Sequence, residues 1–230
     1  MSSPERQEAL ERARSQAAFR LLRRLRHDLA TPLSGAALHL EMSRRRLSGA
    51  TADPVRALES VQLAQREVGY TSSILQPLSD VFSYAEEPAG DFALGDAVRN
   101  GARRSEREAA RRSVTLELPE AGGPRILGMR LQSEDAFAAL TAEAVRRCRE
   151  QGTVVWSCEQ EEDGARAVCR LAGRLGAETL DSVFATRRSE GGGADLSLVL
   201  ARWALESQGA VLSVSHIGDE ATVVVQLTSG

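Results

Sequence analysis

The sequence predicts an α+β protein in which a helical hairpin precedes a domain of mixed helices and strands. Two observations support this fold class. Up to about residue 88, apolar residues recur at three-, four- and seven-residue steps, which is the period of an amphipathic helix. After Asp91, helical patterns alternate with short β-branched runs, which is typical of a two-layer α+β domain. We therefore expect two domains, residues 1–88 and 91–230.

The first domain contains two long helices. The first begins at Ser3-Pro4-Glu5, where a capping hydroxyl precedes Pro and an acid. The turn "SGATADP" ends with Asp53-Pro54, which caps the second helix. A lone hairpin leaves part of its apolar surface uncovered, so we expect a homodimer that forms a four-helix bundle. Its expected core residues are Leu22, Leu25, Leu29, Ala36 and Leu40 in the first helix, and Leu58, Val61, Val68, Leu75 and Phe82 in the second.

The second domain is expected to contain an antiparallel sheet with helices packed on it. The predicted helices cover residues 92–112, 130–152 and 194–209. The predicted strands cover residues 113–118, 125–127, 153–160, 165–172, 210–216 and 221–227.

Composition excludes several functions. Net charge is −3, which gives no whole-chain preference for nucleic acid or membranes. Every basic residue is Arg, so mechanisms that need a lysine amine are excluded. The chain has three Cys and three His without zinc-site spacing, so we expect buried thiols and no metal. No apolar run approaches the roughly 18 residues of a membrane span, and the N-terminus is too charged for a secretory signal. We expect a cytoplasmic protein.

His27 is the candidate nucleophile. It lies two residues from both Leu25 and Leu29, so at 3.6 residues per turn it is rotated about 200° from each and projects outward. A neutral imidazole has a free nitrogen lone pair near neutral pH. The other two histidines are weaker candidates: we expect His39 to be solvated and His216 to be a packing or surface residue.

The residues around His27 fit a reactive histidine. Asp28 can accept a proton from the attacking ring or orient it. Thr31 lies one turn further along the same face. Pro32 costs roughly 3 kcal/mol inside a helix, so we expect a bent or loosened turn that serves as a docking and reaction point.

The stretch "HDLATPL", residues 27–33, resembles the H-box of bacterial two-component histidine kinases, His-Glu/Asp-Leu-x-Thr/Asn-Pro-Leu. The resemblance implies that His27 is the phosphoacceptor and that Asp28 assists its phosphorylation. It also implies that Thr31 can position water for dephosphorylating a partner, and that the hairpin dimerises into a four-helix bundle.

Residues 91–230 resemble the ATP-binding domain of the same kinases, a two-layer α/β sandwich. The match is clearest over the closing stretch, residues 191–227, where a glycine-rich turn precedes a helix and two strands. The resemblance therefore extends over both predicted domains.

The positions that hold nucleotide in that family differ in this chain. Glu143 replaces the magnesium-binding Asn, Leu171 replaces the Asp that recognises adenine, and Leu175 replaces a glycine. Asp195 and Ser197 replace glycines of the phosphate turn, where a Cβ obstructs close approach. Two like charges about 4 Å apart cost ~4 kcal/mol at an effective dielectric of about 20, or roughly 1,000-fold in affinity. We expect a degenerate site without bound ATP, although Glu143 alone could still hold a metal.

Three functions remain open from the sequence. The first is a histidine phosphotransferase that moves phosphate between receiver domains of response regulators, with magnesium supplied by the receiver. The second is a non-catalytic pseudokinase scaffold or inhibitor, and the third is a divergent active kinase. If the protein is a phosphotransferase, four arginines that flank His27 can steer it toward an acidic receiver face. These are Arg20, Arg23, Arg24 and Arg26.

Overall fold

The computed structural model describes residues 3–48, 52–76, 87–173, 183–188 and 193–228. Its described residues form two compact units. The hairpin unit comprises residues 20–83 and 186–196, and the sheet unit comprises residues 1–19, 84–185 and 197–230. This grouping differs from the expected domains, 1–88 and 91–230, in three segments: 1–19, 84–88 and 186–196. Phe82, Leu175 and the glycine-rich residues 189–192 lie outside the described part.

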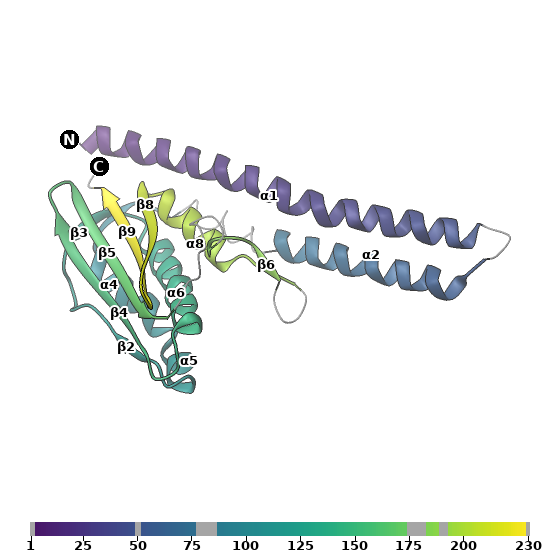
Figure 1. Cartoon of the computed structure of the whole chain (residues 1–230). Helices are drawn as coiled ribbons and strands as arrows, with labels where there is room; N and C mark the ends of the chain where they lie inside the picture. Colours follow the sequence, from purple (N-terminus) through teal and green to yellow (C-terminus); the bar gives the residue numbers. More distant parts are fainter. Residues whose placement is uncertain (1–2, 49–51, 77–86, 174–182, 189–192, 229–230) are drawn as a thin grey trace. The chain divides into compact units, whose positions relative to one another are not determined.

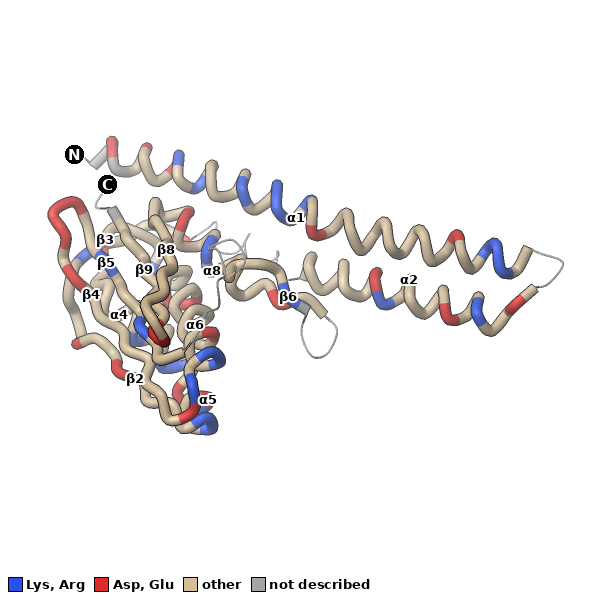
Figure 2. The backbone as a smooth tube through the Cα atoms, in the orientation of Figure 1, with Lys and Arg blue, Asp and Glu red and all other residues tan. Residues whose placement is uncertain are grey.

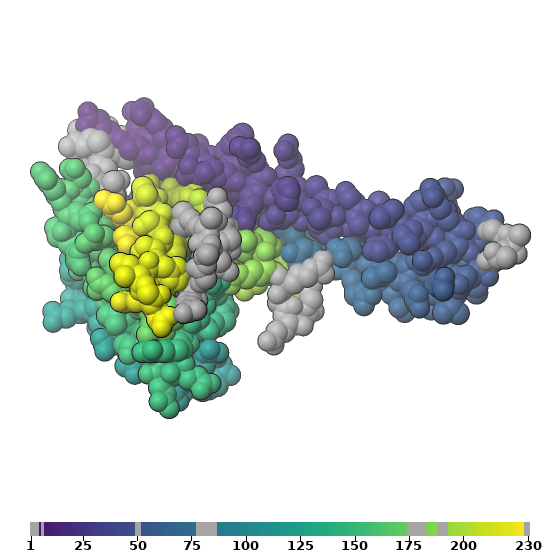
Figure 3. All heavy atoms as spheres, viewed as in Figure 1, coloured from purple at the N-terminus to yellow at the C-terminus, as the bar shows by residue number. Residues whose placement is uncertain are grey.

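The hairpin unit confirms the two predicted helices. From Arg20 onward, α1 (Ser3–Leu47) runs antiparallel to α2 (Pro54–Leu75), and Figure 3 shows the two packed along each other. Asp53 is the N-cap of α2, since its Oδ1 accepts a hydrogen bond of 3.0 Å from the Arg56 backbone N–H. Near the turn, the Arg46 guanidinium donates to Ser60 Oγ at 2.6 Å and thereby links the two helices.

Small and medium-sized residues fill the contact between α1 and α2. Within one chain, the residues expected in the core of the bundle divide into two groups on α1, because Leu25 and Ala36 are buried while Leu22 and Leu40 are 65% and 53% exposed. Leu22 and Leu25 are three positions apart and therefore point about 60° apart, and of the two only Leu25 is buried. The buried residues of the interface are Leu21, Leu25, Pro32, Ala36 and Ser43 on α1, and Ala57, Ser60, Ala64, Thr71 and Ile74 on α2.

Pro32 does not interrupt α1. The helix continues through it to Leu47, and Figure 1 shows no sharp kink, so the expected bent turn is not present. Pro32 is buried on the side that faces α2. Because proline has no N–H, the Asp28 carbonyl four residues earlier lacks its helical hydrogen bond.

The sheet unit contains a five-stranded sheet in the order β2-β4-β5-β9-β8. Its strands are β2 (Thr115–Glu117), β4 (Thr153–Glu161), β5 (Gly164–Ala172), β8 (Ala210–Ile217) and β9 (Glu220–Thr228). All neighbours are antiparallel except β2 and β4, which are parallel, so the expectation of a wholly antiparallel sheet is wrong. Figure 2 shows the acidic turn between β4 and β5.

Helices cover one face of this sheet, which confirms the α+β fold class. They are α4 (Leu94–Arg103), α6 (Arg130–Arg147) and α8 (Ser197–Glu206), with a short α5 (Glu106–Arg111) (Figure 1). Alternate strand residues such as Val154 and Trp156 are buried in the core beneath the helices. Their neighbours, such as Val155, lie half-buried on the opposite face.

All three helices predicted after residue 91 are shorter than expected. The one predicted over residues 130–152 ends at Arg147. Residues 92–112 contain the end of β1 (Gly90–Ala93), then α4 and α5, because a turn at Arg104-Ser105 divides the helical pattern. β1 pairs with β3 (Arg125–Gly128) as a separate ribbon outside the main sheet. Residues 194–195, expected to be helical, form β7 (Ala194–Asp195), which pairs with β6 (Arg187–Arg188) in the hairpin unit.

No helix among the described residues combines the length and the apolar character that crossing a membrane requires.

A buried hydrogen bond between α6 and β4 stabilises the core of the sheet unit. The Trp156 indole N–H donates to Thr141 Oγ1 at 3.0 Å, and the Thr141 hydroxyl donates to the Phe137 carbonyl at 2.7 Å. Phe137 meets the Trp156 ring edge to face, at 5.5 Å between centroids. The polar atom of the indole is thus paired within an otherwise apolar contact.

We predict that Thr141→Val lowers the free energy of unfolding by about 1 to 3 kcal/mol, because the buried indole N–H loses its acceptor. Thr222→Val, on the half-buried face of β9, is the matched control, with an expected change within about 0.5 kcal/mol. Urea denaturation followed by far-UV circular dichroism measures both. An equal loss of unfolding free energy in the two variants would contradict a stabilising role for the hydrogen bond between Trp156 and Thr141.

Candidate functional site

His27 is presented to solvent by α1. Its side chain is 85% exposed, which agrees with the outward direction expected from its spacing. The ring Nδ1 lies 3.4 Å from Asp28 Oδ1, a long contact that a small rotation of the ring shortens. Hydrogen bonds at reactive groups are often long before the partner binds. The arrangement leaves Nε2 directed away from the carboxylate and accessible to a partner.

Asp28 is held more firmly than His27. Its side chain is 20% exposed, and its Oδ2 accepts a hydrogen bond of 2.6 Å from Thr186 Oγ1. The Arg24 guanidinium Nε lies 3.7 Å from the same oxygen. Both partners therefore engage Oδ2, while Oδ1 is the oxygen nearest His27.

Thr31 lies on the same exposed side of α1. Its hydroxyl is 3.4 Å from the His27 carbonyl, to which it donates a weak hydrogen bond. The sequence-predicted trio of His27, Asp28 and Thr31 is thus brought together on two adjacent helical turns. The hydroxyl is accessible to solvent, so it can also contact water beside the imidazole.

Thr186 is a site residue that sequence analysis missed. It is 158 positions from Asp28 and comes directly before β6, a two-residue strand with no periodic signal. The segment that contains it belongs to the hairpin unit, and a second contact anchors that segment. The Ala194 backbone N–H donates to Ser73 Oγ of α2 at 2.7 Å. Only the folded chain brings these residues to the hairpin.

The predicted arginines differ in their surroundings. Arg20, Arg23 and Arg26 are exposed, whereas Arg24 is half-buried beside Asp28. Figure 2 shows basic residues distributed along α1. Exposed ion pairs contribute little to stability, so the position of these cations matters chiefly for the local field around His27.

Glu143, at the predicted metal position, is tied to its own helix. It is 4% exposed, and its Oε2 accepts from the Arg146 guanidinium at 2.7 Å. Its Oε1 accepts from Arg147 Nε at 2.5 Å. Both carboxylate oxygens are thus neutralised by arginine, which opposes the use of this group as a magnesium ligand.

Leu171, at the predicted adenine position, is part of the hydrophobic core. It is 1% exposed and offers no hydrogen-bond acceptor from its side chain. Gly173 follows it closely, and a Cβ there would lie 2.4 Å from the Arg147 carbonyl oxygen. Packing of the end of β5 against the end of α6 therefore requires this glycine, whether or not nucleotide binds.

Asp195 and Ser197 complete the predicted degenerate site. Asp195 lies half-buried in β7 of the hairpin unit, and Ser197 begins α8 in the sheet unit. Glu143 and Leu171 also belong to the sheet unit. The four residues are divided between the two units, so no common geometry is described for them.

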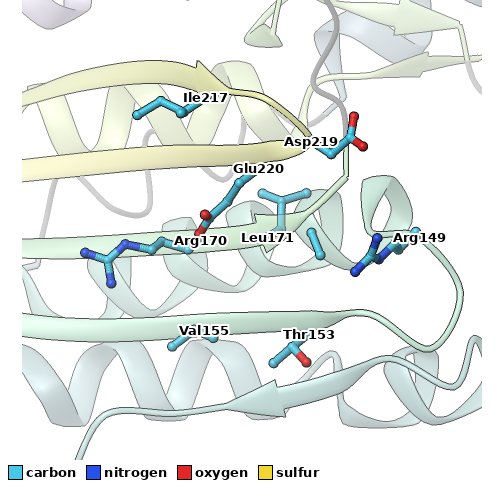
Figure 4. A pocket seen from close by; sticks show the side chains of 9 residues that line it. Arg149, Thr153, Val155, Arg170, Leu171, Ile217, Asp219 and Glu220 are labelled. Carbon is cyan, nitrogen blue, oxygen red and sulfur yellow. The ribbon is translucent and has the colours of Figure 1, made fainter.

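A cavity of about 380 Å³ lies on the sheet face opposite the helices (Figure 4). Arg170 of β5 lines it together with Arg149, and the acids Asp219 and Glu220 oppose them from the β8–β9 turn. The charges of two cations and two carboxylates cancel in this cavity. It therefore lacks the net positive charge that would favour a triphosphate.

The remaining titratable groups form no reactive cluster in the described part of the chain. Burial raises the pKa of the Cys158 thiol to about 12 and also raises the pKa values of Cys148 and Cys169, so all three remain protonated at neutral pH. Among the described residues, no group of three His, Cys, Asp or Glu side chains is arranged to hold a metal. His216 is exposed, but His39 is half-buried, so the expectation that His39 is solvated is wrong.

Solved histidine kinases have a similar architecture. The Acinetobacter baumannii histidine kinase AdeS is 16% identical over 89% of this chain and 98% of its own, with a TM-score of 0.56. ThkA, solved in complex with the response regulator protein TrrA, is 13% identical over 100% of this chain and 68% of its own, with a TM-score of 0.55. ShkA, solved in complex with AMPPNP, is 17% identical over 94% of this chain and 46% of its own, with a TM-score of 0.54.

No protein-family model and no curated protein matches the chain. The likeness to solved structures concerns the fold. A helical hairpin is followed by a sheet domain that has the fold of the histidine kinase ATP-binding domain.

Proposed function

We propose that the chain is a histidine phosphotransferase of a two-component phosphorelay. His27 accepts phosphate from the phospho-aspartate of one receiver domain and passes it to another receiver, without ATP. The observation that carries this proposal is the 85% exposed imidazole of His27 beside the Asp28 carboxylate. A purely structural histidine on a helix surface needs neither that exposure nor that neighbour.

The proposed transfer is a displacement at phosphorus. The Nε2 lone pair of His27 forms the P–N bond while the acyl-phosphate P–O bond of the receiver breaks and releases its carboxylate. The positive charge that develops on the ring is stabilised by Asp28, which takes the Nδ1 proton. The reverse sequence of steps passes phosphate to a second receiver. Magnesium belongs to the receiver's acidic pocket in this scheme.

The state of the sheet unit supports a route that does not use ATP. Glu143 is engaged by two arginines, and Leu171 packs in the core. The resemblance in sequence implies two further changes in the phosphate turn, where Asp195 and Ser197 stand in place of glycines. Each change weakens nucleotide binding by a different physical route, so their effects combine.

The proposed partners are response-regulator receiver domains. ThkA, which shares this fold, was solved in complex with a response regulator protein. The exposed arginines Arg20, Arg23 and Arg26 place positive charge on the N-terminal side of His27, which favours an acidic docking surface. We propose no contact with nucleic acid or membranes and a cytoplasmic location.

A homodimer is part of this proposal because the hairpin leaves one apolar face uncovered. On α1 the face consists of Leu22, Leu29, Leu33, Leu40 and Leu47, which point within about 20° of one direction. His27 points about 140° away from that direction, so a partner hairpin on the face leaves the imidazole accessible. On α2 the face continues through Leu58, Val61, Val68 and Leu75.

A divergent histidine kinase is the second candidate function. It is favoured by the fold, since AdeS, ThkA and ShkA are histidine kinases and ShkA was solved with AMPPNP. A non-catalytic scaffold is the third, and the close grouping of His27, Asp28 and Thr31 counts against it. The source of phosphate distinguishes the three.

We predict that radiolabelled phosphate reaches this chain from phosphorylated receiver domains, and only when His27 is present. The full chain is incubated with a panel of labelled receivers and, separately, with labelled ATP. His27→Ala should abolish labelling, whereas His216→Ala, at an exposed position of β8, should retain it. The label should be lost in acid and stable in base, as expected for a P–N bond. Labelling from ATP would support the divergent kinase, and no labelling from either source would support the scaffold.

We predict that Mg-ATP leaves the Tm of the chain unchanged. A ligand at 100 times its Kd stabilises the folded state by about 2.7 kcal/mol, which raises Tm by about 5 to 11 °C at this chain length. ShkA is a suitable positive control in the same thermal-shift measurement. A dose-dependent rise in Tm of this chain would contradict loss of the nucleotide site.

We predict that Leu33→Glu combined with Leu40→Glu converts a dimer to a monomer, because the charges are placed on the face that a second hairpin would cover. Leu38→Glu is the matched control, since Leu38 is 59% exposed but points about 160° from Leu40. Light scattering coupled to size-exclusion chromatography gives the masses. A monomeric unmodified chain would refute the homodimer.

A further inference from the structure

The contact between Thr186 and Asp28 is the best-defined polar contact at the candidate site. The Oγ1–Oδ2 distance of 2.6 Å is that expected for a hydroxyl donating to an ionised carboxylate. Both side chains are half-buried, in contrast to the exposed imidazole. A charge-assisted hydrogen bond that is partly shielded from water fixes the orientation of its acceptor more strongly than an exposed ion pair does.

We infer that Thr186 is a positioning residue for the phosphoacceptor, acting through Asp28; this inference rests on the proposed phosphotransfer at His27. The hydroxyl of Thr186 holds Oδ2 and thereby directs Oδ1 toward Nδ1 of His27. Thr186 touches neither the reacting nitrogen nor the phosphoryl group.

The division of roles between the two carboxylate oxygens explains why this orientation matters. Arg24 approaches the oxygen that Thr186 already engages, so neither partner competes for Oδ1. Oδ1 then favours the tautomer of His27 that carries its proton on Nδ1. In that tautomer Nε2 keeps the lone pair that attacks phosphorus.

The position of Thr186 depends on a segment from elsewhere in the chain. Two described residues contact the two helices of the hairpin: Thr186 contacts Asp28 on α1, and Ala194 contacts Ser73 on α2. The orientation of Asp28 is therefore coupled to the docking of this segment. Displacement of the segment would free the carboxylate to rotate without altering the helix that bears His27.

The rate test uses Thr186→Val, which removes the hydroxyl and keeps the side-chain volume. In single-turnover transfer from a phosphorylated receiver, we expect labelling of His27 to slow about 10-fold. Thr186→Ser should restore most of the rate, because the donor returns. Thr222→Val, which is the same substitution on β9, should change the rate less than twofold.

A double-mutant cycle separates positioning from a general structural effect. In an Asp28→Ala background, Thr186→Val should change the remaining rate less than twofold, because the residue through which it acts is absent. An equal slowing in both backgrounds, or no slowing in either, would overturn the inference.

A measurement that needs no receiver keeps this test separate from that of the proposed function. The ring ¹⁵N shifts of His27, assigned with His27→Ala, report its tautomer in the unphosphorylated chain. Thr186→Val should lower the share of the Nδ1–H tautomer, and Thr186→Ser should restore it. If no receiver labels the chain but the tautomer shifts as expected, the proposed function fails while the positioning role holds. An unchanged tautomer in Thr186→Val would overturn the positioning role.

Discussion

Packing between α1 and α2 is the constraint on which the hairpin unit depends. The buried residues of this contact include Ala36, Ala57, Ser60 and Ala64, all of which have small side chains. Once this face of α1 is turned toward α2, the directions of all other positions on the helix follow from 3.6 residues per turn. His27 is then directed to solvent, and the leucines at positions 22, 29, 33, 40 and 47 are left for another partner.

The same packing explains how a proline is accommodated next to the candidate nucleophile. Pro32 lacks an N–H, and the loss of one helical hydrogen bond lowers stability. Because Pro32 is buried against α2, the apolar contact of its ring offsets part of this loss. The helix stays continuous and the unpaired carbonyl belongs to Asp28.

The two units differ in how their candidate functional residues are engaged. In the sheet unit, packing features such as Gly173 and the buried contact between Trp156 and Thr141 are intact. Its Glu143 and Leu171 instead make contacts within the unit, to arginines and to the core. In the hairpin unit, the imidazole and its carboxylate remain accessible.

The sequence by itself determined the features that depend on local periodicity and capping. It predicted the hairpin, the Asp53-Pro54 helix start, the strands β4, β5, β8 and β9, and the outward direction of His27. It did not predict the break between α4 and α5 or the parallel pairing of β2 with β4, because these depend on packing against distant strands. Only the tertiary structure decided that Leu25 rather than Leu22 faces α2. It alone brought Thr186 to Asp28, because a contact between residues 158 positions apart leaves no mark in a local pattern.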